Sequence, residues 1–166
     1  MSPVAAFSLG SNLGDRLEFL QHAVFGLCGV GLAKVRVSAV YETAPVDYLA
    51  QPDFLNAVLL AQSDLAPEDL LDAALQVETR LGRSRAVPKG PRCVDIDLIA
   101  VGDETRDTPR LTLPHPRAGG RAFVLVPWLE LDPDAWLPGK GRVDELLAGL
   151  DATGVRRTSL ELAVPV

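Results

Sequence analysis

Two aspartates, Asp95 and Asp97, lie two positions apart in an apolar segment of the chain. If that segment is a β-strand, both carboxylates project from one face, with their Cα atoms roughly 7 Å apart. Two like charges on one face of an apolar strand repel each other and lose hydration. A divalent cation relieves both costs, because Mg²⁺ binds a few carboxylates together with phosphate oxygens. The pattern therefore predicts a metal site, and the alternative is a solvated pair neutralised by arginines.

A basic segment leads directly into this aspartate pair. It carries Arg83, Arg85, Lys89 and Arg92, the last of them three residues before Asp95. The planar guanidinium group can bind two phosphate oxygens at once. Arginines beside paired carboxylates therefore favour phosphate binding in a phosphoryl-transfer site over a merely solvated loop.

The distribution of charge also indicates a local anion site. The formal net charge is −6, which disfavours a general nucleic-acid binder. Residues 83–121 nevertheless carry eight Lys/Arg against five Asp/Glu, whereas the rest of the chain carries eight against seventeen. A basic segment in an acidic protein is typical of a site for a single phosphorylated ligand.

Two further polar residues each have two interpretations. Glu78 falls inside the apolar arc of a predicted helix, where a carboxylate rarely lies unpaired. It either binds the polar edge of a ligand or pairs with Arg83 or Arg85. His115 has proline on both sides, which fixes its backbone. It is either a hydrogen-bond partner of a phosphate or a structural histidine.

An aromatic ring and an amide, Phe54 and Asn56, lie two positions apart on a predicted strand and therefore share a face. Stacking on the ring and a two-sided hydrogen bond to the amide would suit a flat heterocycle with amide-like edges. The alternative is a core phenylalanine beside an asparagine at the edge of a strand.

Residues 10–14 form a glycine-containing turn before a helix and could bind a phosphate. The turn lacks the Lys-Ser/Thr of a Walker loop and the spacing of a dinucleotide loop. Capping of the helix by Ser11 or Asn12 is the simpler interpretation.

Periodicity and turn residues predict the elements that position these side chains. The predicted order of strand, helix, strand, strand, helix and strand matches a split βαβ, ferredoxin-like plan, an α+β fold with helices packed on a sheet. Residues 121–131 could be helix or strand, and residues 43–53 are predicted to be a loop. The predicted strands are 4–9, 33–42, 54–62 and 94–101, with a possible edge strand at 155–164. Three helices are predicted. The first follows residue 12, with Gly26 and Gly29 marking its end, the second runs from Pro67 to about Gly82, and the third covers 143–150.

Composition sets the broad class. The 166 residues are 48% hydrophobic and 23% charged, which predicts one globular domain, 1–166. No apolar run is long enough to span a bilayer, and no basic region precedes an apolar stretch at the N-terminus, so a cytoplasmic protein without a secretory signal is expected. Cys28 and Cys93 lack metal-like spacing and indicate thiols of a reducing compartment.

Six segments, taken together and in this order, resemble the 6-hydroxymethyl-7,8-dihydropterin pyrophosphokinase family. The resemblance runs from Ala6 to about Pro138, and several independent motifs in one order make it specific. The segments are 8–14, 41–46, 51–57, 90–98, 111–115 and 121–123.

The resemblance implies a monomeric cytoplasmic enzyme of folate synthesis with a ferredoxin-like fold. The substrates would be ATP and a reduced pterin, with neither nucleic acid nor membrane as partner. The hydroxyl of the pterin's hydroxymethyl group would attack the β-phosphorus of Mg-ATP, and AMP would leave. Two Mg²⁺ ions would be held by Asp95 and Asp97.

The resemblance also implies roles for individual residues. Phe54 and Phe123 would sandwich the pterin ring, and Arg83, Arg92 and Asp97 would be catalytic. The edges of the pterin would be bound by Asn56 and by the segment of Thr43, Ala44, Pro45 and Val46. The nucleotide would be bound by Glu78, Arg83, Arg85, Arg92, Ile96, Arg110, Thr112, His115 and Arg121.

The sequence departs from the family pattern at several positions. Phe54 stands where the family often has Tyr, Pro88 and Lys89 where a Trp is frequent, and Leu75 where a Gln is common. These changes affect nucleotide affinity rather than the reaction. Two rival functions are a ferredoxin-like binding module without catalysis and another phosphotransferase or nucleotidyltransferase that uses the same carboxylates.

Overall fold

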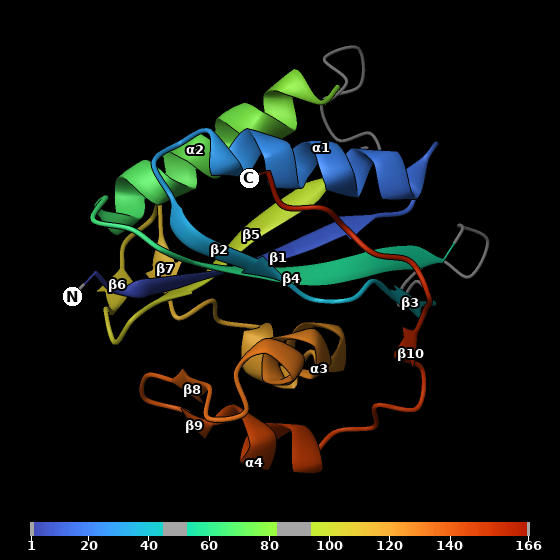
Figure 1. Ribbon diagram of the computed structural model, residues 1–166. Helices are drawn as coiled ribbons and strands as arrows, with labels where there is room; N and C mark the ends of the chain where they lie inside the picture. The colour runs from blue at the N-terminus through green and yellow to red at the C-terminus, as the bar shows by residue number, and fades with distance from the viewer. Residues whose placement is uncertain (1, 45–52, 83–93, 166) are drawn as a thin grey trace.

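The computed structural model describes residues 2–44, 53–82 and 94–165, and within them it forms three layers. Helices α1 and α2 cover one face of a central sheet, and α3 and α4 lie beyond the other face (Figure 1). The bounds of the α-helices are α1 Arg16–Cys28, α2 Pro67–Arg80, α3 Ala122–Leu131 and α4 Val143–Ala148, with a 3₁₀ turn at Ala118–Gly120.

The central sheet has six strands in the order β10-β3-β4-β1-β5, with β2 also paired to β4. Among the described residues its strand pairings are all antiparallel, which confirms the predicted α+β fold. Helices cover both faces of the sheet (Figure 1), whereas the predicted plan has helices packed on a sheet without a second helix layer. The strands are β1 Val4–Ser11, β2 Ala33–Val37, β3 Tyr41–Thr43, β4 Phe54–Gln62, β5 Asp95–Val101 and β10 Arg156–Arg157. Two small hairpins join β6 Arg106–Asp107 to β7 Thr112–Leu113 and β8 Trp136–Leu137 to β9 Gly141–Arg142.

Alternation along the strands divides the core in two. In β4, Leu55 and Leu59 are buried in the cluster that packs under α1 and α2. Val58 and Leu60 are buried in the cluster that packs under α3 and α4. Both faces of β1 and β4 are covered by a helix layer, so both strands have nearly continuous apolar sequences.

The start of α1 differs from the prediction. Strand β1 continues to Ser11, which pairs with Leu55, so neither Ser11 nor Asn12 caps the helix. The N-cap is Asp15, whose side chain accepts a hydrogen bond from the backbone N–H of Glu18 at 3.1 Å. Residues 10 and 11 are therefore the end of strand β1, and the turn before α1 follows them, with Gly14 at a positive φ of 63°.

The end of α1 also differs, because Gly26 lies within the helix and Gly29 follows its last residue. A Cβ at Gly26 would meet Cγ1 of Val77 at 2.8 Å. Gly26 therefore permits the close approach of α1 and α2, and only Gly29 marks the end of the helix.

Three other segments refine the prediction. Residues 33–42 form two strands, β2 and β3, and residues 155–164 contribute only the two-residue β10. Residues 121–131, which the pattern left open, form helix α3 despite an internal Pro127. Among the described residues, no helix combines the length and apolar character needed to cross a membrane.

Candidate active site

One row of residues crosses the sheet and joins the two halves of the candidate site. Gly10 of β1 is aligned with Asn56 of β4 on one side and with Asp95 of β5 on the other. Residues aligned across strands project from the same face, here the face that α3 covers. The candidate heterocycle-binding residues and the carboxylate pair therefore lie on one face, separated by a single strand.

Gly10 leaves the space that this arrangement needs. A Cβ at Gly10 would lie 3.2 Å from Oδ1 of Asn56 and 3.8 Å from Cδ1 of Phe54. A side chain here would press on Asn56, because a contact of 3.2 Å forces the neighbour to shift, and it would touch Phe54 at ordinary van der Waals distance. The sequence pattern predicts a turn at Gly10 and does not reveal this role, although a glycine inside a strand is a signal of close approach.

The heterocycle half of the site is built on β3 and β4. The Nδ2 of buried Asn56 donates a hydrogen bond to Oγ1 of buried Thr43 at 2.7 Å. This bond holds the amide in one orientation. A side chain that binds a ligand by hydrogen bonds needs such a fixed orientation, because its donor and acceptor must point in set directions. Phe54 is half-buried at the start of β4, as is Phe123 in the first turn of α3. Ala44 is exposed at the end of the described part of this segment.

The carboxylate half is built on β5, an edge strand of the sheet. Asp95 and Asp97 are both half-buried and alternate with buried Ile96. The Nη1 of Arg121 lies 3.9 Å from Oδ2 of Asp97, and its guanidinium carbon lies 5.6 Å from the centre of the Phe123 ring. Arg121 therefore links the carboxylate pair to the aromatic side of the site.

The described residues include no group of three or more His, Cys, Asp or Glu side chains that could hold a metal ion. Two aspartates on one face are nevertheless a suitable donor set for Mg²⁺. That ion is commonly bound by one or two carboxylates, waters and substrate phosphates. The residues present fit a metal that arrives with a nucleotide.

Glu78 lies on the opposite side of β5 from the aspartates. It is 4% exposed, and its Oε2 accepts a hydrogen bond from the backbone N–H of Ile96 at 3.0 Å. The carboxylate thus joins α2 to the edge strand between the two aspartates. Its predicted pairing with Arg83 or Arg85 falls on residues outside the described part of the chain.

His115 is held at both its backbone and its ring. Its N–H donates to the carbonyl oxygen of Ile99 at 2.8 Å, and its Nδ1 accepts from the N–H of Arg117 at 3.1 Å. Burial lowers the pKa of His115 below its ordinary value, Asp97 opposes that shift, and Arg121 and Arg117 reinforce it. The ring is therefore neutral at neutral pH with its proton on Nε2, which can donate to a phosphate oxygen.

The lowered pKa of His115 predicts a pH-dependent stability. Because the unfolded chain binds this proton more readily, the contribution is fully present above pH 6.5 and is lost as pH falls through the folded-state pKa. Unfolding by urea at pH 7 and pH 5 should show a smaller difference in stability for His115→Gln than for the wild type. His22→Gln is the matched control, because it removes the other histidine, and it should keep the wild-type difference.

Arg110 and Thr112 belong to the β6–β7 region, and β7 contacts β5. Arg110 forms an ion pair with Asp72 of α2, and its Nη2 lies 3.4 Å from the carbonyl oxygen of Glu68. Thr112 is exposed. The structure therefore places Arg110 against α2, where it would have to exchange Asp72 for a phosphate.

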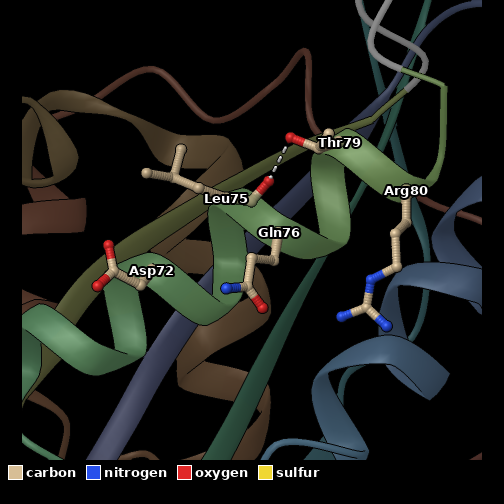
Figure 2. A pocket seen from close by; sticks show the side chains of 5 residues that line it. All are labelled: Asp72, Leu75, Gln76, Thr79 and Arg80. Atoms are coloured by element: carbon tan, nitrogen blue, oxygen red, sulfur yellow. Dashed lines mark hydrogen bonds between the residues drawn. The ribbon is translucent and has the colours of Figure 1, made fainter.

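A shallow hollow of about 400 Å³ lies along the outer face of α2 (Figure 2). None of the predicted site residues lines it, although Asp72 links it to Arg110. Leu75, the position where the family often has Gln, is 38% exposed here. The lining residues are Asp72, Leu75, Gln76, Thr79 and Arg80.

The structure therefore brings together one group of predicted residues, those on the α3 face of the sheet and at the start of α3. They are Thr43, Phe54, Asn56, Asp95, Asp97, Arg121 and Phe123. The predicted residues Pro45, Val46, Arg83, Arg85 and Arg92 lie outside the described residues.

The fold and the site define an α+β protein in which a candidate heterocycle-binding pair and a pair of aspartates lie on one sheet face. Residues 6–133 match the family described as 7,8-dihydro-6-hydroxymethylpterin-pyrophosphokinase, or HPPK. The chain belongs to this family of ATP-dependent pyrophosphokinases.

Named relatives agree with this assignment. The chain is 46% identical to the 2-amino-4-hydroxy-6-hydroxymethyldihydropteridine pyrophosphokinase of Mycobacterium leprae, over 93% of this chain and 88% of that protein. Its identity to the enzyme of the same name from Bacillus subtilis is 42%, over 79% of each chain. It is also 40% identical to the folic acid synthesis protein fol1 of Pneumocystis carinii, but spans only 18% of that longer protein.

Solved structures agree on the fold. A crystal structure of an HPPK-DHPS from Plasmodium falciparum matches with a TM-score of 0.69 at 13% identity. The match covers 89% of this chain and 43% of that one. At this level of identity the comparison supports the α+β fold alone.

Proposed function

We propose that this chain transfers the diphosphate of Mg-ATP to the hydroxymethyl group of 6-hydroxymethyl-7,8-dihydropterin in folate biosynthesis. The substrate oxygen forms a bond to the β-phosphorus of ATP. The bond from the β-phosphorus to the oxygen it shares with the α-phosphorus breaks, and AMP leaves with that oxygen. The observation that carries the proposal is the row Asn56, Gly10, Asp95, whose members project from one face of the sheet. This arrangement supports a pterin site next to a phosphate site.

The pterin side rests on rings and a fixed amide. Phe54 and Phe123 would hold the flat ring between them, since aromatic faces recognise planar heterocycles. Asn56, oriented by Thr43, would bond an edge of the pterin. Specificity follows because a pterin edge leaves no unpaired polar group there, whereas an apolar ring would.

The phosphate side rests on Asp95 and Asp97, which we propose hold two Mg²⁺ ions together with ATP oxygens. Bound Mg²⁺ neutralises phosphate charge and aligns the reacting oxygens. Arg121 adds a cation beside Asp97, and the neutral His115 supplies a hydrogen-bond donor. Alignment and charge stabilisation suffice for this reaction, so no nucleophilic side chain is needed.

The remaining nucleotide contacts stay proposals from the resemblance. Ile96 and Glu78 would act through the strand that carries the aspartates, and Arg110 and Thr112 through the adjacent hairpin region. The chemistry of the guanidinium group supports the same role for Arg83, Arg85 and Arg92.

We further propose that the chain acts as a cytoplasmic monomer. Cys28 is a free, partly buried thiol, and burial raises its pKa, which lowers its reactivity. A free thiol of this kind suits a reducing compartment.

Incubation with Mg-ATP and the reduced hydroxymethyl pterin, followed by separation of the nucleotides, tests the proposal. AMP should form in proportion to the pterin consumed. Stoichiometric ADP together with a pterin monophosphate would contradict it, and no ATP consumption at all would favour the binding-module alternative.

A further inference from the structure

We propose that Arg156, in the C-terminal segment, is a positioning residue for the pterin side of the site. The inference rests on the proposed function, and it concerns a strand that lies beyond residues 6–133, the part that matches the family. Arg156 belongs to β10, which pairs with β3 at the edge of the sheet (Figure 1).

Arg156 bridges the two strands that carry the proposed pterin-binding residues. Its Nη2 donates to Oε1 of Glu42 at 3.3 Å and to Oδ2 of Asp53 at 2.9 Å. Glu42 lies on β3 directly before Thr43. Asp53 directly precedes Phe54, the first residue of β4. One guanidinium group thus ties the neighbour of a pterin-edge residue to the neighbour of a stacking residue.

Arg16 at the start of α1 completes the same cluster. Its Nη1 donates to the other carboxylate oxygen of Glu42, Oε2, at 3.1 Å and to the backbone oxygen of Asp53 at 2.7 Å. Glu42 therefore accepts from one arginine on each oxygen. With two cations and two carboxylates the cluster is neutral overall, so its contacts fix positions without leaving a net charge.

The C-terminal segment is held in place by contacts independent of Arg156. The N–H of Thr158 donates to the backbone oxygen of Val40 at 2.9 Å. Further along, Gln21 of α1 makes two hydrogen bonds of 2.7 Å with the backbone of Ala163. The segment therefore crosses from β3 to α1, as Figure 1 shows, and presents Arg156 as an already ordered group.

Exposure separates a positioning role from a role in global stability. The side chain of Arg156 is 57% exposed, and those of its partners Glu42 and Asp53 are 29% and 38% exposed. Ion pairs this exposed contribute little to unfolding. Their geometry nevertheless fixes the relative position of β3 and β4, which a two-strand ligand site requires.

Steady-state kinetics of Arg156→Ala tests the proposal. The KM for the pterin should rise roughly tenfold, within the range of coupling seen in ion-pair networks. The KM for ATP and the melting temperature should stay close to wild type. Arg156→Glu should raise the pterin KM further, because it places a third carboxylate in the cluster, and Arg156→Lys should restore part of the loss.

Arg157→Ala is the matched control, since it lies on the same strand and instead faces Glu130 at 3.8 Å. It should leave the pterin KM unchanged. An unchanged pterin KM in both Arg156→Ala and Arg156→Glu, or equal rises in the KM of both substrates, would overturn the inference while AMP formation by the wild type upholds the proposed function. Failure of the wild type to form AMP would instead overturn the proposed function, and the inference with it.

Discussion

Replacing Asp97 by alanine is expected to lower turnover on the order of 10²–10³-fold, because groups that stabilise developing phosphate charge contribute to that extent. Asp95→Ala should have a comparable effect, since the two carboxylates share one face of β5. The fold should be retained, because both side chains are only half-buried and the ion pair of Asp97 with Arg121 is long, at 3.9 Å.

Removing one carboxylate also relieves repulsion between the pair. We therefore expect the metal-free Asp97→Ala protein to melt no lower than the wild type, and Mg-ATP to stabilise it less. Asp103→Ala, in the exposed turn after β5, is the matched control and should keep normal activity. Near-normal turnover in both Asp95→Ala and Asp97→Ala would rule out the metal assignment.

Truncation of Phe54 to alanine should weaken pterin binding about 10- to 100-fold, through loss of stacking and of buried apolar area. ATP affinity should change little, because Phe54 lies on β4 and the carboxylates lie two strands away on β5. Phe54→Tyr keeps the ring, so it should be nearly silent. Titration of a pterin analogue and of Mg-ATP measures both affinities.

Phe25→Ala provides the control for general effects of losing an aromatic ring. Phe25 is 44% exposed on α1 and belongs to neither half of the site. Its replacement should leave both affinities unchanged. Equal losses of pterin and ATP affinity in Phe54→Ala would place Phe54 in the core rather than against the pterin.

The regular elements were predictable where a local pattern agrees with the packing. Strand β4 has the predicted bounds, 54–62, because its apolar run is bounded by polar and turn residues. Helix α2 begins at Pro67, as predicted, because proline suits the first turn of a helix. It ends at Arg80, close to the predicted position, and Gly82 follows with a positive φ of 101°.

Other elements depend on tertiary contacts that no local pattern records. Helix α3 is apolar almost throughout and contains Pro127, so neither helical nor strand periodicity is visible. The cap at Asp15 follows from how far β1 extends beside β4, which places Ser11 in the sheet. Strand β10 has only two residues, and its pairing with β3 joins positions more than 100 residues apart.

The candidate site likewise has features that a local pattern predicts and features that depend on tertiary contacts. Alternation along a strand suffices to place Asp95 and Asp97 together, and likewise Phe54 and Asn56. The alignment of Asn56 with Asp95 through Gly10 requires the strand order β4-β1-β5, which is a property of the whole sheet. The contact of Glu78 with the Ile96 backbone likewise depends on how α2 packs on β5.

The most direct test of the central claim follows the substrate oxygen. The pterin is labelled with ¹⁸O in its hydroxymethyl group, and the products formed with Mg-ATP are examined by ³¹P NMR. If the substrate hydroxyl attacks the β-phosphorus, the pterin product carries two coupled phosphorus signals, the one nearer the pterin shows the isotope shift, and AMP is unlabelled. A single unsplit phosphorus signal in the pterin product, or release of pyrophosphate with a labelled pterin–AMP adduct, would contradict diphosphate transfer.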